Sequence, residues 1–65
     1  MTIDLPDHLI ALETAAWAEI QAGRLTVETA RAVHEAVGAF AENAGLRRMD
    51  VELELKTLVR YTAAA

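Results

Sequence analysis

The sequence has 65 residues, with no cysteine and no serine, and it contains only one proline and three glycines. Without cysteine, the chain has no disulfides and no thiolate zinc site to stabilise so small a fold. Thiol and serine nucleophiles are excluded, and so is an acyl or peptidyl carrier, whose pantetheine arm needs a serine. A glycine-rich phosphate loop is also missing. We therefore predict that the protein is not an enzyme and binds no small-molecule cofactor.

Metal-binding patterns are missing as well. Neither of the two histidines, His8 and His34, has a second ligand three or four residues later that completes a familiar metal spacing. We predict no metal site, and we expect His34 to lie half-buried at the edge of the second helix.

Glu13 falls nearly inside an apolar arc of the first helix, where an unpaired carboxylate is costly to bury. We expect it at the rim of the core, paired with an arginine.

Long apolar runs are absent, since no 18 consecutive residues are apolar. The first residues, MTIDLPDH, do not join a basic stretch to an apolar one, as a secretory signal does. We predict no membrane span and a cytoplasmic protein.

Positive charge is scarce and unevenly distributed. Residues 1–46 carry seven acidic and two basic side chains, whereas residues 47–65 carry three acidic and four basic ones. The formal net charge of the chain is −4. An acidic protein repels the phosphates of nucleic acids, so only the last third of the chain escapes this objection to nucleic-acid binding.

Apolar residues make up 54% of the chain, and the abundance of alanine favours helices. Their helical spacing, interrupted at Gly23 and Gly45, predicts helices at about 6–22, 27–44 and 47–62. Thr26 is the predicted N-cap of the second helix.

Apolar and polar residues alternate from Val51 to Lys56, as in a β-strand. A single strand would have no partner to pair with, so we predict a helix here. We predict an all-α, compact three-helix bundle forming a single domain, 1–65. Its core stripes are Leu5, Leu9, Leu12, Ala16 and Ile20; Val27, Ala30, Val33, Val37, Phe40, Ala41 and Ala44; and Val51, Leu55, Leu58 and Val59.

Residues Ala41–Lys56 resemble the helix-turn-helix motif of many bacterial repressors. Ala41 stands four residues before the turn glycine Gly45, Leu46 follows the glycine, and the aliphatic Val51 comes six after it. In that motif the second helix enters the major groove of DNA. The resemblance implies an outer face bearing Arg47, Arg48, Met49, Glu52, Leu53 and Lys56, with Arg60 a turn beyond.

Two further apolar lines lie beside the core stripes. The first is Ile10 with Trp17, and the second is Met49 with Leu53. Either Leu53 reaches the first helix while Trp17 closes the core edge, or the extra lines form an exposed patch, as partner surfaces do. Trp and Met are enriched at such surfaces.

We predict a small non-enzymatic protein-interaction or regulatory module that binds another protein or itself, as a homodimer. Its expected partner-binding residues are Ile10, Trp17, Met49 and Leu53. The alternative is a dimeric helix-turn-helix regulator that binds DNA through Arg47, Arg48, Lys56 and Arg60.

Overall fold

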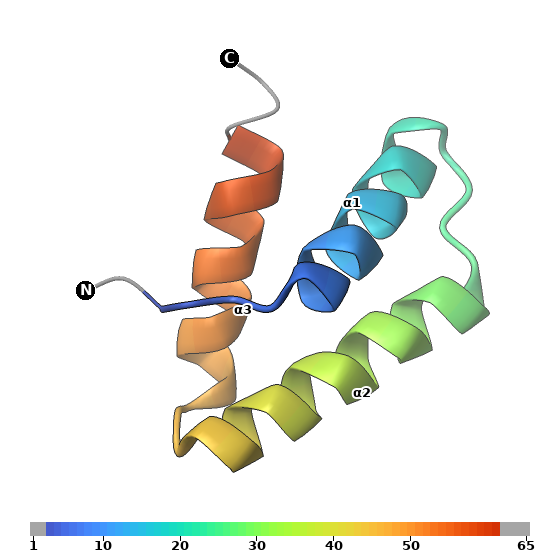
Figure 1. The fold of residues 1–65 in the computed structure, drawn as a ribbon. Coiled ribbons are helices and arrows are strands. Elements are labelled where there is room, and N and C mark those ends of the chain that lie inside the picture. The colour runs from blue at the N-terminus through green and yellow to red at the C-terminus, as the bar shows by residue number, and fades with distance from the viewer. Residues whose placement is uncertain (1–2, 62–65) are drawn as a thin grey trace.

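A computed structural model describes residues 3–61, and these residues form helices joined by short connections (Figure 1). The elements are α1 (Asp7–Gln21), α2 (Val27–Ala44), α3 (Arg48–Lys56) and η1 (Thr57–Tyr61), a π-helical turn that continues α3. The predicted all-α, three-helix fold is confirmed, with helix ends within a residue or so of those expected from the sequence. The last residue of the third predicted helix, Thr62, lies outside the described residues.

The helices α3 and η1 stand against one end of the α1–α2 pair. In Figure 1, α2 runs back past α1, and α3 with η1 rises steeply from the end of α2, beside the start of α1. The N-terminal segment crosses α3, and Ile3 borders a shallow pocket together with side chains of that helix.

The turn between α2 and α3 depends on Gly45. Its φ of 69° is left-handed, which glycine adopts without a steric penalty. This conformation lets the amide of Leu46 donate to the carbonyl of Ala41 at 2.9 Å, closing the end of α2. Gly23, with φ 76°, ends α1 in the same way. The predicted glycine stops are therefore present in the structure.

The hydrophobic core lies where α3 and η1 cover α1 and the C-terminal half of α2. The other ends of the predicted stripes, near the α1–α2 connection, are not covered by a third helix. Val27 is therefore 73% exposed and Ile20 is partly exposed, so both predicted core assignments are wrong. Ala30 and Ala44 are exposed as well. The buried cluster consists of Leu9, Val37, Ala41, Val51, Leu55 and Val59.

The π-helical turn η1 changes which residues of the third stripe face the core. In a regular α-helix with about 3.6 residues per turn, a residue eight positions on is rotated by about 80°. The wider turn of η1 reduces this drift. Val59 therefore stays buried in line with Val51 and Leu55. Leu58 is exposed, so its predicted place in the core is wrong.

The α1–α2 connection is held by one carboxylate. Thr26 is the N-cap of α2, as predicted, and its hydroxyl accepts a hydrogen bond from the amide of Thr29. Glu19 accepts from the Thr26 amide at 2.9 Å and from the Thr29 hydroxyl at 2.7 Å. These hydrogen bonds lower the pKa of the Glu19 carboxyl, and the bond from the Thr26 amide has the largest effect. Its charge also lies at the positive end of the α2 dipole.

We predict that Glu19→Gln destabilises the protein at neutral pH. Because the folded pKa lies below the ordinary value of about 4.3, the ionised group stabilises the fold above that pH. This stabilisation is lost as the pH falls through the folded pKa. The midpoints of urea unfolding of wild type and Glu19→Gln, measured from pH 7 to pH 3, should therefore converge at acid pH. Glu35→Gln, at an exposed position in α2, is the control. A gap between wild type and Glu19→Gln that stays constant with pH contradicts the assignment.

Candidate functional site

The outward side of α3 carries an exposed apolar pair. Met49 is 77% exposed and Leu53, one turn later, is 65% exposed. Leu53 stays out of the core because Val51 and Leu55, on the opposite side of α3, occupy the core positions. We call Met49 and Leu53 the α3 outer face.

The other two predicted partner-binding residues lie elsewhere. Ile10 and Trp17 are half-buried and pack against the core cluster. The guanidinium of Arg60 covers Trp17, 4.8 Å from the ring centroid, an arrangement typical of a cation–π contact. Two of the four predicted residues are therefore strongly exposed on α3, whereas the other two are half-buried beside the core.

A buried ion pair joins the end of the chain to α1. Glu13 is only 2% exposed, and its Oε2 accepts a hydrogen bond from Arg60 Nε at 3.0 Å. The predicted pairing with an arginine is present, but the carboxylate is buried rather than at the rim. The two residues are 47 positions apart, so no local pattern identifies the partner. Among residues 3–61, no buried side-chain nitrogen or oxygen lacks a hydrogen-bond partner.

Arg48 fastens the start of α3 to α2. Its Nη1 donates to the carbonyl of His34 at 3.2 Å and lies 3.0 Å from His34 Nδ1. The guanidinium rests against Gly38, where a Cβ would collide with it, so this helical glycine makes room for the contact. His34 is exposed rather than half-buried as expected, even though Arg48 contacts its ring.

Each residue proposed for DNA binding pairs with an acidic group of the chain. Arg47 Nε lies 3.1 Å from Asp50 Oδ2. Glu52 stands between Arg48 and Lys56, with 3.7 Å from each cation to one of its carboxylate oxygens. Arg60 is held by Glu13.

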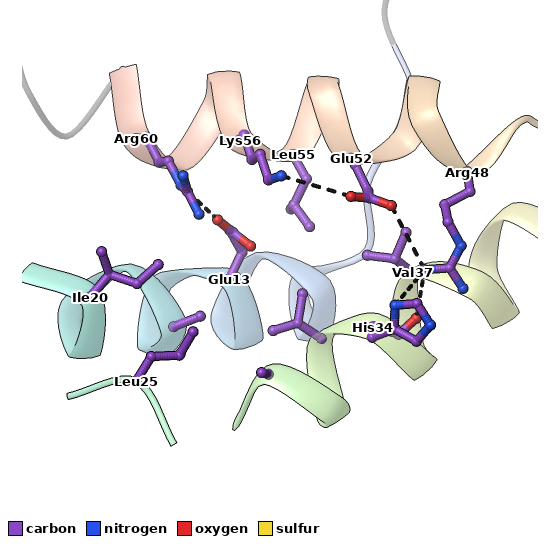
Figure 2. Close-up of a pocket in the computed structure, with 13 residues that line it drawn as sticks. Glu13, Ile20, Leu25, His34, Val37, Arg48, Glu52, Leu55, Lys56 and Arg60 are labelled. Atoms are coloured by element: carbon purple, nitrogen blue, oxygen red, sulfur yellow. Dashed lines mark hydrogen bonds and ion pairs between the residues drawn. The ribbon is translucent and has the colours of Figure 1, made fainter. Parts of the chain in front are cut away.

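A groove of about 200 Å³ lies between α3 and the other two helices. Figure 2 shows the charged side chains of α3 and η1 in a row, with Leu55 of α3 and Val37 of α2 between the helices. Ile20 and Leu25 lie at the end near the α1–α2 connection, and Arg48 with His34 lies at the other end. We call it the cationic groove, because its lining includes three basic and two acidic side chains: Arg48, Lys56, Arg60, Glu13 and Glu52.

The described part of the chain offers no metal-binding cluster. Residues 3–61 contain no group of three acidic or histidine side chains arranged to hold a metal ion. None of the helices described is both long and apolar enough to cross a lipid bilayer. Comparison with protein-family models, curated proteins and solved structures found no match to this chain. The functional assignment therefore depends on the α3 outer face and the cationic groove.

We predict that Arg60→Met destabilises the protein by about 2 kcal/mol. This is less than the roughly 3–5 kcal/mol typical of a broken buried pair, because the Arg60 side chain is 28% exposed. The loss arises because the Glu13 carboxylate remains buried without its partner. The double variant Glu13→Leu/Arg60→Met should recover to within about 1 kcal/mol of wild type. Urea unfolding followed by circular dichroism measures all three proteins. An Arg60→Met variant as stable as wild type contradicts this role.

Proposed function

We propose that the protein is a small, non-enzymatic protein-interaction module whose partner docks on the α3 outer face. The observation that carries this proposal is the exposure of Met49 and Leu53, adjacent on one helix face, in a chain that has a separate core. Exposed neighbouring apolar side chains favour burial against another protein, and methionine adapts its shape to such contacts. We leave Ile10 and Trp17 out of the proposed contact surface because they are half-buried against the core and expose less apolar area.

The location of these residues on a regular helix supports the same proposal. Met49 and Leu53 project from α3, whose other side is fixed by Val51 and Leu55 in the core. Their backbone is therefore already ordered before a partner arrives, which lowers the entropic cost of binding. Charged side chains flank the pair on α3, as they flank the apolar centre of many interfaces. A partner helix or sheet edge would cover the apolar pair and leave these charges at the rim.

We predict that a photoreactive residue at position 49 or 53 forms covalent adducts with a specific protein when the chain is expressed in its native cells. The same residue at position 27 is the matched control, because Val27 is equally exposed but lies away from α3. Mass spectrometry of the adducts identifies the partner, and a product of twice the chain mass identifies a homodimer. Adducts that form equally well from position 27, or from none of the three positions, contradict the proposal.

The alternative function, a helix-turn-helix regulator that binds DNA, is favoured by one observation. A short turn around Gly45 joins α2 to α3, as in that motif. The side chains of the motif argue against DNA binding. Arg48 is held against α2, and Arg60 lies over Trp17. The outer face of α3 presents Met49 and Leu53 at the positions where polar groups would contact bases.

We therefore expect micromolar protein to leave the electrophoretic mobility of duplex DNA unchanged at low salt. The physical reason is that ion pairing within the chain already neutralises most of the positive charge on α3. A shift that weakens steeply with added salt and is reduced in the Arg47→Ala/Arg48→Ala variant would instead support the DNA-binding alternative.

A further inference from the structure

The cationic groove has an excess of positive charge at one position. Arg48 and Lys56 share the single carboxylate of Glu52, at 3.7 Å each. The other ion pair of the groove, Arg60 with Glu13, is balanced. One positive charge is therefore left unneutralised beside Glu52, in a chain whose formal net charge is −4. The charged side chains of the groove lining thus sum to +1 in a chain that is acidic as a whole, which favours an anionic occupant over a basic one.

The floor of the groove is apolar. Val37 and Leu55 lie at its base but are each only 1% exposed, so the apolar surface open to an occupant comes from Ile20 and Leu25, which are 38% and 45% exposed. An occupant therefore needs an apolar group to cover Ile20 and Leu25 and an anionic group within reach of Lys56 or Arg48. Both requirements are met by an aliphatic side chain with a carboxylate close to it.

The size of the groove favours part of a larger molecule. Its volume of about 200 Å³ lies below the roughly 300–1,000 Å³ of pockets that enclose free small molecules. It has room for one or two side chains, so the remaining affinity must come from a neighbouring surface. The α3 outer face is that surface, because Arg48, Glu52 and Lys56 border both the groove and a shallow hollow beside Met49 and Leu53.

We propose that the cationic groove binds an acidic amphipathic peptide segment of the partner protein. One aliphatic side chain of the segment covers Ile20 and Leu25, and a glutamate or aspartate nearby pairs with Lys56 and Arg48. This inference rests on the proposed interaction function and adds the charge and character of the partner. The commitment to an acidic segment follows from charge complementarity, because a basic segment would meet the unneutralised cation beside Glu52.

The test is a titration of the isotope-labelled protein with two synthetic peptides of about 14 residues, a length at which helices are marginally stable in water. Both peptides carry leucine at i, i+3, i+4 and i+7. One has glutamate and the other lysine at the flanking positions. We expect saturable shifts in the methyl signals of Ile20 and Leu25 with the glutamate peptide only.

Two variants and one control locate the binding. Lys56→Glu should weaken binding of the glutamate peptide about tenfold, and Ala30→Leu should weaken it by filling the groove without altering charge. Arg47→Glu changes the net charge by the same amount as Lys56→Glu but lies outside the groove lining, so its binding should stay within about twofold of wild type. Circular dichroism confirms that each variant is folded.

The outcomes separate this inference from the interaction function. Equal binding of both peptides, or equal weakening by Lys56→Glu and Arg47→Glu, overturns the acidic-segment proposal. Peptide-induced shifts confined to Met49 and Leu53 overturn it too, while leaving the α3 outer face as a docking surface. The signals of groove residues can instead change with protein concentration and not with added peptide. A second copy of the chain is then the occupant, and this result also overturns the proposal.

Discussion

The contact between Arg60 and Glu13 is the constraint on which the arrangement of the third helix depends. It joins η1 to α1 through a buried carboxylate, and the same guanidinium covers Trp17. A buried ion pair is weak evidence for added stability, because desolvation offsets its attraction, but it disfavours arrangements that leave either charge unpaired. Rotating η1 on its axis would separate these groups. The pair therefore favours the rotation in which Val51, Leu55 and Val59 face inward.

The exposed surface of α3 follows from this rotation. With one side of the helix in the core, Met49 and Leu53 point outward, and a row of alternating charges separates them from the cationic groove. Arg48 is additionally fixed to α2 through the His34 carbonyl, with Gly38 making room for it. The two proposed contact regions are thus parts of one continuous surface. A single partner segment is able to cover both, with its apolar side chains on either side of Glu52.

Local sequence chemistry was sufficient to predict most of the fold. Helix ends at Gly23 and Gly45 and the cap at Thr26 depend on interactions between neighbours in the chain, so they were readable without tertiary information. The burial of individual stripe residues was less predictable. Val27 has helical spacing typical of a core residue, yet it is exposed because α3 does not extend over that end of α2. Leu58 is exposed because a π-helical turn follows Lys56, and the sequence pattern did not predict that turn.

The candidate site was predicted only in part, for a related reason. An arginine partner for Glu13 followed from the cost of burying its charge, but the choice of Arg60 required the packing of η1 on α1. The cationic groove involves all three helices and the α1–α2 connection, so no single segment contains its pattern. Met49 and Leu53 were recognisable as an extra apolar line. Whether they joined the core depended on how α3 is rotated, which local spacing leaves undetermined.

The rotation of α3 is tested most directly by covalent footprinting of its two leucines in the folded protein. Leu53 and Leu55 have the same side-chain chemistry and lie on one helix, so their labelling by a photogenerated carbene differs only through solvent access. The structure predicts strong labelling of Leu53 and protection of Leu55, with equal labelling after unfolding in urea. Equal labelling of the two leucines in the folded protein, or stronger labelling of Leu55, would contradict the outward orientation of Met49 and Leu53 and the function proposed for them.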